Sequence, residues 1–264
     1  MTEPSDSLEL AFLSNLEYFR ELTRRSGGTV LDQDGITCFA SPHPMPGLIS
    51  GVFRTDPATS PADVLGRARE FFAPMGRSIP VSALVGRDDD LIAAAVEAGC
   101  TMDGPVPLQV LVRQRLDGPD RDDVEFRSVA DDAGITDYIT VCREAHASYG
   151  FPDDLFPTLF GRPAAILAPH LHAFVGYDRG DPVAAATLFL THGVAYVGWV
   201  AVVSDRRRRG LGAAATAVVV NRGFELGASC STLLASPMGT AVYRGLGFAD
   251  VGALIELAPP SRGG

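Results

Sequence analysis

Hydrophobic residues in the second half of the chain switch between the spacing of a helix and that of a strand. Residues 131–149 place apolar side chains at helical spacing behind an acidic start. Residues 171–176 and 182–190 are apolar segments on either side of a polar turn, which is typical of paired strands. An apolar strand at 194–203 leads into an apolar helix that opens near residue 211. This succession predicts an α/β domain.

The first half of the chain repeats this alternation in a shorter form. A helix is predicted from about residue 8 to 25, and a strand at 106–112 closes the half. The elements predicted between them are strands at 28–31, 36–40 and 47–53, a helix at 61–72, a strand at 81–85 and a helix at 89–97. Because this order parallels that of the second half, we expect two copies of one fold in tandem. An unrelated N-terminal α/β domain is the alternative.

A basic turn with two glycines separates the strand at 194–203 from the helix that follows. Four arginines at 206–209 precede Gly210, Leu211 and Gly212. The first turn of a helix has about four backbone N–H groups without internal partners, and glycine lets a phosphate approach them. A mononucleotide P-loop would need Lys-Ser/Thr after a glycine, and none follows here. Residues 210–215 fit a dinucleotide fingerprint only if its last glycine is relaxed to alanine, and the further βαβ unit of that fold is lacking, so a nucleotide-dependent enzyme stays a distant alternative. A solvated basic face is the alternative, and we keep it for Arg206.

Two motifs make the sequence resemble the GCN5-related N-acetyltransferase (GNAT) family. The first is Arg207-x-x-Gly210-x-Gly212 behind an apolar strand, and the second is Tyr-x-x-x-Gly-Phe at residues 243–248. The resemblance covers about residues 124–260. It implies an acyl-CoA N-acyltransferase-like fold, with a mixed, mostly antiparallel sheet flanked by helices, here in two tandem halves.

The resemblance also implies a coenzyme A site. The basic turn would hold the pyrophosphate of acetyl-CoA, or of another short acyl-CoA, by its backbone amides, and the preceding strand would pair with the pantetheine arm. Tyr243 stands where the family often keeps a tyrosine that reaches the cofactor sulfur, so it is the implied catalytic acid; a core tyrosine is the alternative. Ser236 stands where many members have Asn. The implied cofactor-binding residues are Val200, Val202, Val203, Arg207, Arg208, Arg209, Gly210, Leu211, Gly212, Ala213, Ala214, Ser236 and Tyr243.

The implied reaction is direct transfer of an acetyl group to a primary amine within a ternary complex. The oxyanion that forms needs a fixed donor, for which the N–H of Val202 is the candidate. Many family members carry a glutamate on the strand before the phosphate turn as general base, but residues 196–201 contain no carboxylate. Glu144, His146 and His192 are the candidate bases. The missing carboxylate leaves a second function open, that of a catalytically weak acyl-CoA-binding regulatory or scaffold protein.

The acceptor is a small-molecule or peptide amine that the sequence does not identify. In the family, the loop between the first two helices of the domain commonly forms part of the acceptor site, and here residues 148–156 are aromatic and acidic. Aromatic rings beside carboxylates suit a cationic amine on an apolar body. The alternative is that Phe151, Leu155 and Phe156 are core residues that pack a second helix.

The polar stretch 116–123 contains Gly and Pro and marks the boundary between the halves. We therefore predict an N-terminal domain at 1–118 and an acetyltransferase domain at 124–264. The turn after the third strand of the first half has two prolines, an aspartate and no glycine pair, so it offers few donors and repels phosphate. Ala95 stands where Tyr243 stands in the second half. The first half is therefore predicted to be a degenerate copy without a cofactor site.

Composition narrows the class of protein further. A chain of 264 residues, 46% hydrophobic and 20% charged, suits two folded domains. A net charge of −10 disfavours nucleic acid and anionic membranes as partners and suits a cationic acceptor. No signal peptide and no apolar run of about 20 residues is recognised, so we expect a cytoplasmic protein; a homodimer is left open. Neither a metal site nor a disulfide is predicted from the unpaired spacing of Cys38, Cys100, Cys142 and Cys230.

Overall fold

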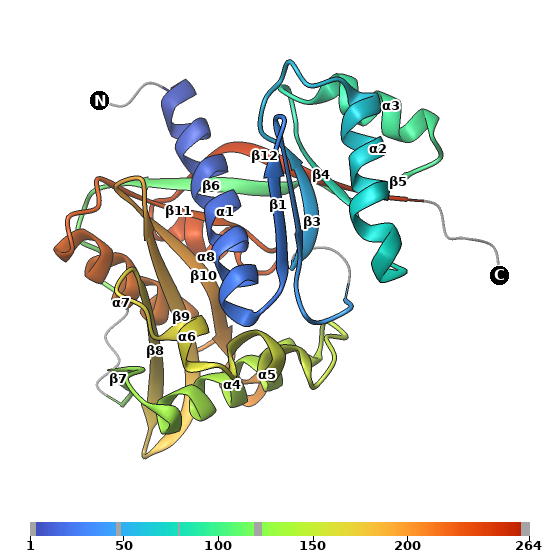
Figure 1. Ribbon diagram of the computed structural model, residues 1–264. Coiled ribbons are helices and arrows are strands. Elements are labelled where there is room, and N and C mark those ends of the chain that lie inside the picture. The colour runs from blue at the N-terminus through green and yellow to red at the C-terminus, as the bar shows by residue number, and fades with distance from the viewer. Residues whose placement is uncertain (1–3, 46–48, 79, 119–122, 260–264) are drawn as a thin grey trace. The chain divides into compact units, whose positions relative to one another are not determined.

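The computed structural model describes residues 4–45, 49–78, 80–118 and 123–259, and the chain forms two compact units (Figure 1). Unit 1 comprises the residues up to Tyr18 together with Leu108–Val251, and unit 2 comprises Phe19–Pro107 together with the residues from Gly252 onward. Three elements begin in one unit and end in the other, namely helix α1 (Pro4–Ser26) and strands β6 (Val106–Val112) and β12 (Ala249–Ala258).

The sheet of unit 1 has the strand order β6-β11-β10-β9-β8-β7. All neighbours in this order are antiparallel except β10 and β11, which are parallel. The strands beside β6 are β7 (Glu125–Ser128), β8 (Leu171–Asp178), β9 (Asp181–Thr191), β10 (Val194–Val202) and β11 (Cys230–Leu234). The helices of unit 1 beyond α1 are α4 (Asp132–Ala147), α5 (Leu155–Phe160), α6 (Pro163–Ile166), the 3-10 turn η2 (Ser204–Arg206), α7 (Leu211–Glu225) and α8 (Thr240–Gly245).

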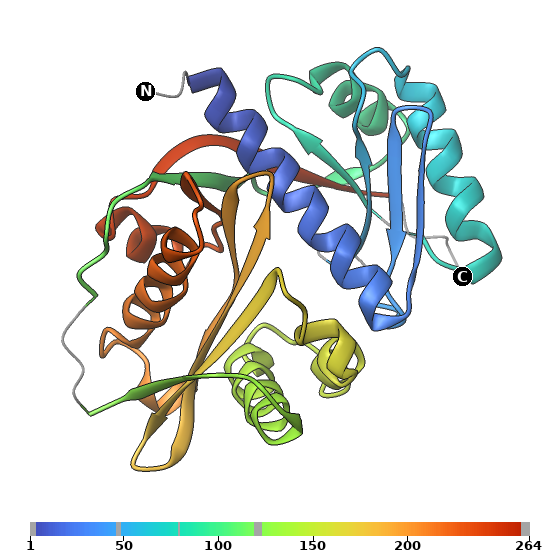
Figure 2. The ribbon, with the colours of Figure 1, turned by 60° about the vertical axis from the view of Figure 1, so that its left-hand side comes forward.

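Helices α7 and α4 cover opposite faces of the central strands of unit 1 (Figure 2). Successive side chains of a strand point to opposite faces. Leu188 and Val197 pack with the small apolar residues of α7 in one core cluster. Tyr196, one residue away from Val197, instead stacks on the ring of Tyr18 at 4.9 Å between centroids. The second face therefore carries the stacked rings of Tyr18 and Tyr196.

The sheet of unit 2 has the strand order β1-β2-β3-β4-β12, with β5 also paired to β12. Strands β3 and β4 are parallel and the other pairs are antiparallel. Its strands are β1 (Thr29–Gln33), β2 (Ile36–Ala40), β3 (Ser50–Arg54), β4 (Val81–Leu84), β5 (Thr101–Met102) and the second part of β12, and its helices are α2 (Pro61–Phe72), the 3-10 turn η1 (Ala73–Met75) and α3 (Asp89–Glu97).

The two units share one topology. In each, two parallel neighbours are joined by a helix, β10-α7-β11 in unit 1 and β3-α2-β4 in unit 2. In each, an antiparallel strand from the other half of the sequence pairs with the later of those two strands, β6 with β11 and β12 with β4. The compact units therefore do not coincide with the predicted ranges 1–118 and 124–264, because each half of the sequence contributes a closing strand to the other unit. Residues 119–122 of the predicted boundary lie outside the described residues.

Both units form the mixed, mostly antiparallel open sheet flanked by helices that the sequence predicted. Within the described part of the chain, no helix is both long and apolar enough to cross a membrane.

Candidate functional site

The parallel strands β10 and β11 stay paired for only part of their length. Their ladder runs from Val194, opposite Cys230, to Val197, opposite Leu233, whereas β10 continues to Val202. The register of β10 with β9 shifts between Gly198 and Ala201, which is a β-bulge, and Trp199 within it has a φ of 48°. In the described residues, the end of β10 therefore pairs with β9 on one side and has no strand partner on the β11 side.

The amide of Val202 points toward this unpaired side. The N–H of Val203 donates to the carbonyl oxygen of Val183 on the strand before, at 3.1 Å. Backbone groups of consecutive residues in a strand point to alternate sides, so the N–H of Val202 points away from β9. The carbonyl oxygen of Val202 accepts the Nε–H of Arg207 at 3.3 Å on that side. The N–H of Val202, which was predicted as the oxyanion donor, is thus directed to the side of β10 on which the described residues provide no strand partner.

Helix α7 begins at the end of β10 without a side-chain cap. Gly210 is its N-cap residue, with a left-handed φ of 79° that favours glycine, and no side chain accepts the first amides of the helix. A β-carbon added at Gly212 would meet only Cγ2 of Val202, at 3.9 Å. Helix N-termini with such free amides bind anions readily. The turn therefore offers both the donors and the room that a phosphate group needs.

The four arginines of the turn divide into two pairs. Arg206 forms ion pairs with Asp178 at 3.1 Å and Asp205 at 3.4 Å, in agreement with a structural role. Arg207 reaches the C-terminal end of α4, where its guanidinium donates to the carbonyl oxygen of Ala145 and to the hydroxyl of Ser148. The other two, Arg208 and Arg209, are exposed. The sequence had placed Arg207 in the cofactor site but gave no sign of its bonds to α4.

For several of the predicted cofactor-binding residues, the backbone N–H is already bonded or the side chain packs in the core, so that group does not donate to the cofactor. The N–H of Ala214 already donates to the carbonyl oxygen of Gly210 at 3.0 Å, and the N–H of Val203 is bonded to Val183. The side chain of Leu211 is buried, and Val200 packs against the core on the α7 side. The amides of Gly212 and Ala213 in the first turn of α7 are the ones best placed for an anion.

Tyr243 lies on α8, with its ring packed edge-on against Phe248 at 6.0 Å between centroids. Burial raises the pKa of its phenol well above the usual value, and the nearby phenol of Tyr149 adds to the rise. The hydroxyl is therefore protonated at neutral pH. Ser236 is exposed and caps the turn before α8, since its hydroxyl accepts the N–H of Gly239 at 3.2 Å.

A cluster of rings surrounds His146 near the end of α4. The Nδ1 atom of His146 lies 2.8 Å from the carbonyl oxygen of Cys142. Burial lowers the pKa of the imidazole, the positive charge of Arg207 lowers it further, and the bond to Cys142 opposes both. The neighbouring ring centroids are those of Phe156 at 5.0 Å, Phe151 and Trp199 at 5.7 Å and Tyr149 at 5.9 Å.

The other two candidate bases lie elsewhere. Glu144 is exposed and, two residues from His146, projects from a different side of the helix. His192 precedes β10 and lies 4.0 Å from Glu17. Seven residues separate it from Trp199, which in a strand is on the order of 20 Å. Of the three candidates, only His146 contacts the bulge of β10.

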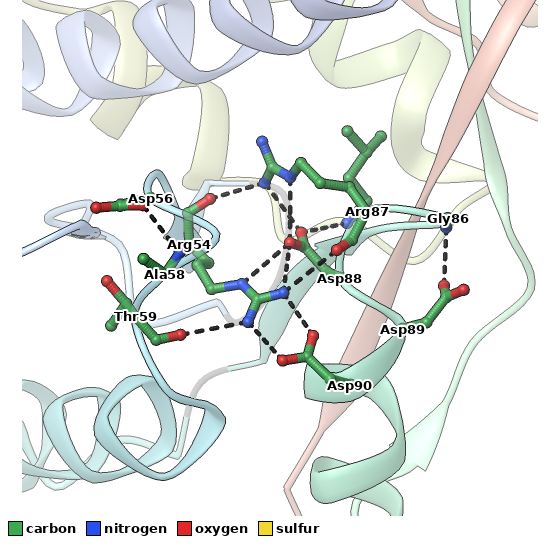
Figure 3. A network of polar contacts seen from close by, with 10 residues as sticks. Arg54, Asp56, Ala58, Thr59, Gly86, Arg87, Asp88, Asp89 and Asp90 are labelled. Carbon is green, nitrogen blue, oxygen red and sulfur yellow. Dashed lines mark hydrogen bonds and ion pairs between the residues drawn. The ribbon is translucent and has the colours of Figure 1, made fainter.

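The corresponding place in unit 2 is closed by ion pairs (Figure 3). Arg54, the last residue of β3, is 1% exposed and pairs with the fully buried Asp88 at 3.0 Å and with Asp90 at 2.6 Å. Asp88 also accepts the N–H of Leu84 at 2.8 Å, and Arg87 donates to the carbonyl oxygen of Arg54 at 2.7 Å. Side chains of the protein thus fill the position that the basic turn and α8 frame in unit 1. This network was not predicted, although an arginine at the end of an apolar strand and the acidic run 88–90 are its signs in the sequence.

The described residues contain no group of three or more His, Cys, Asp or Glu side chains that could hold a metal ion. All four cysteines are free thiols.

Comparison with known proteins identifies the domain around this site. Residues 136–248 match the model of the Acetyltransferase (GNAT) family, so this part of the chain is a GNAT-family domain. The match runs from α4 to the end of the Tyr-x-x-x-Gly-Phe motif, and it includes the bulge and the basic turn. No curated protein sequence matches the chain.

Solved structures share the fold over almost the whole chain. A GCN5-related N-acetyltransferase from Kribbella flavida has a TM-score of 0.72 at 23% identity and covers 96% of each chain. A second one, from Sphaerobacter thermophilus, has a TM-score of 0.64 at 14% identity, with 97% of this chain and 94% of that chain covered. A conserved protein of unknown function from Staphylococcus epidermidis ATCC 12228 has a TM-score of 0.65 at 17% identity and covers 88% of this chain and 93% of that chain. The predicted acyltransferase fold is confirmed.

Proposed function

We propose, from the GNAT-family domain at residues 136–248, that this chain is an N-acetyltransferase that uses acetyl-CoA or another short acyl-CoA. One observation carries the proposal. The strand β10 leaves its parallel partner after Val197 and ends at an uncapped helix N-terminus with room at Gly212. A strand edge followed by free amides suits a ligand with an amide-containing arm and a pyrophosphate.

The residues present fit coenzyme A. The unpaired backbone of Val200 and Val202 would bond the pantetheine amides, and the first-turn amides of Gly212 and Ala213 would bond the pyrophosphate. Arg208 and Arg209, both exposed, would add positive charge beside the phosphates. The space beside Gly212, where an added β-carbon would meet only Cγ2 of Val202 at 3.9 Å, supports this assignment.

Bound acetyl-CoA would supply the thioester carbon that the acceptor amine attacks. The N–H of Val202 would stabilise the oxyanion, because it is fixed in the strand and points away from β9. The phenol of Tyr243 would protonate the leaving sulfur, since its raised pKa keeps the proton available. Both roles suit direct transfer of the acetyl group within a ternary complex.

The acceptor would be a primary amine of a small molecule or peptide that enters beside the loop 148–154. Tyr149 is 43% exposed and Phe151 is half-buried, so both could contact an acceptor. Leu155 and Phe156 are fully buried, as the core interpretation of these residues predicts. The net charge of −10 suits a cationic acceptor.

We further propose that the chain arose as a tandem form in which the N-terminal half has no cofactor site. The shared order β10-α7-β11 and β3-α2-β4 supports duplication. The ion pairs of Arg54 and the absence of a glycine pair after β3 support the loss of the site. This half would serve to complete the fold of the acetyltransferase.

A catalytically weak acyl-CoA-binding protein is the second candidate, because β10 carries no carboxylate that could act as base. Two measurements separate the functions. Calorimetry with coenzyme A measures binding, and thiol release from acetyl-CoA across a panel of primary amines measures transfer. The enzyme is expected to turn over at least one amine, and Tyr243→Phe is expected to slow transfer about 100-fold while leaving coenzyme A affinity unchanged.

The matched control is Tyr177→Phe. Tyr177 lies on β8, and its hydroxyl donates to Asp137 of α4 at 2.8 Å, so its removal should leave the rate of transfer unchanged. Tight binding of coenzyme A together with thiol release that never exceeds blank hydrolysis would favour the binding protein instead.

A further inference from the structure

We propose that His146 is the general base of this acetyltransferase, replacing the carboxylate that β10 lacks; the inference rests on the proposed function and names how its acceptor loses a proton. His146 lies near the end of α4, between the half-buried ring of Phe151 and the bulge of β10. Three independent features of its surroundings support the role.

The first feature is the tautomer. A carbonyl oxygen can only accept a hydrogen bond, so the contact of 2.8 Å to Cys142 requires the proton on Nδ1. In the neutral ring, the lone pair is then on Nε2. The bond also fixes the orientation of the ring, as a residue that orients a catalytic histidine does.

The second feature is the position of the ring. Its centroid lies 5.7 Å from that of Trp199, which is part of the bulge from which β10 runs unpaired to Val202. Arg207 links the same two elements, because it bonds both the carbonyl oxygen of Val202 and that of Ala145. His146 is therefore held beside the strand that would carry the thioester.

The third feature is the electrostatic surroundings. The rings of Phe151, Phe156 and Trp199 pack around the imidazole, and burial together with the charge of Arg207 lowers its pKa and so favours the neutral ring. The ionisable groups on the packed elements include the thiol of Cys142, whose pKa burial raises to about 12, the phenol of Tyr149, the guanidinium groups of Arg143 and Arg207 and the exposed carboxylates of Glu144, Asp153 and Asp154. No carboxylate pairs with His146 in the described residues, so its lone pair is not engaged by one.

The proton balance follows from this placement. An acceptor that arrives as an ammonium loses two protons. Nε2 of His146 takes the first, which frees the nitrogen lone pair to form the C–N bond, and later releases it to solvent. Tyr243 donates its phenolic proton to the sulfur as the C–S bond breaks, and the second proton of the nitrogen restores the phenol. The products are the amide, the thiol and one proton.

Two variants of His146 separate base catalysis from packing. His146→Asn keeps an N–H group that can donate to Cys142 but has no basic nitrogen, and His146→Phe keeps a ring in the aromatic cluster. His192→Asn removes another candidate base that lies far from the bulge, and it serves as the control. Titration of every variant with coenzyme A shows whether the cofactor site is intact. Loss of cofactor binding, which would count against the proposed function, is thereby distinguished from loss of the general base.

The probes are 2-phenylethylamine, which is an ammonium at neutral pH, and aniline, which is already neutral. Both His146 variants should lose about 100-fold in kcat/KM for 2-phenylethylamine and less than about threefold for aniline. With wild type, kcat/KM for 2-phenylethylamine should reach its plateau as pH rises through a value below 6.5, because His146 must be neutral. With the variants it should keep rising until the amine itself is neutral.

A nuclear magnetic resonance titration of the imidazole in the coenzyme A complex gives a readout without any acceptor. The expected result is a neutral Nδ1–H tautomer with a pKa below 6.5. Equal losses for both amines, an unchanged pH profile in His146→Asn, or an Nε2–H tautomer would each overturn the proposal.

Discussion

Gly212→Val probes the cofactor turn with little expected effect on the fold. The β-carbon would lie 3.9 Å from Cγ2 of Val202 and would meet no other atom within 4 Å, so the substitution adds a side chain into open space. Glycine in a helix costs about 1 kcal/mol relative to alanine, and valine costs up to about 0.7 kcal/mol. The free energy of unfolding should therefore change by only a few tenths of a kcal/mol.

Binding of coenzyme A should suffer far more. The valine methyl groups would occupy the space in which a phosphate must sit to accept the amides of Gly212 and Ala213. Hydrogen bonds to charged groups are worth about 1.5 kcal/mol or more each, so the loss of two is about 3 kcal/mol, or about 100-fold in Kd.

Isothermal titration calorimetry with coenzyme A measures this loss, and thermal unfolding verifies the fold. Gly66→Val is the matched control, because Gly66 lies in helix α2 of unit 2 and a β-carbon there meets nothing within 4 Å. Coenzyme A affinity in Gly212→Val within threefold of wild type would refute the placement of the pyrophosphate at this turn.

Two further predictions concern the phenol of unit 1 and the ion pairs of unit 2. Because burial raises the pKa of Tyr243 above its usual value near 10, the acid stays protonated as pH rises; with aniline as acceptor, kcat should therefore show no decline between about pH 7 and 9.5. A decline there that Tyr243→Phe abolishes would contradict the assignment. Arg54→Met leaves the buried carboxylate of Asp88 with Arg87 as its remaining cation, so urea unfolding should show a loss of about 3 kcal/mol. Coenzyme A affinity of that variant should be unchanged, and weaker binding would show that unit 2 takes part in the site.

The local elements of the site could be predicted because the sequence pattern that determines each one lies within about 20 consecutive residues. The strand at 194–203, the glycine-containing turn and helix α7 follow from apolar spacing and from the conformational freedom of Gly210. Helix α5 agrees with the alternative in which Leu155 and Phe156 pack a second helix. The four-residue helix α6 and the two-residue strand β5 were not predicted, because segments this short show no hydrophobic periodicity.

Long-range features could not be predicted from local pattern. The apolar strand β6 was expected to close the first half, but it pairs with β11, and β12 in turn pairs with β4. Strands β6 and β12 are both apolar, so their composition does not indicate which strand each one pairs with; only the complete fold decides the pairing. The same limit applies to side chains, since nothing near Arg207 or His146 in the sequence indicates that one holds α4 and the other contacts Trp199.

The most direct test of the proposed coenzyme A site is a crystal structure of the chain grown with acetyl-CoA. We expect one cofactor in unit 1, with its pantetheine arm along Val200 to Val202, its phosphates on the amides that follow Gly210, and its sulfur beside the hydroxyl of Tyr243. The turn after β3 should hold no cofactor. An acetyl-CoA bound elsewhere, or a cofactor in unit 2 with the α7 turn unoccupied, would contradict the assignment of this chain as an acetyltransferase of the proposed geometry.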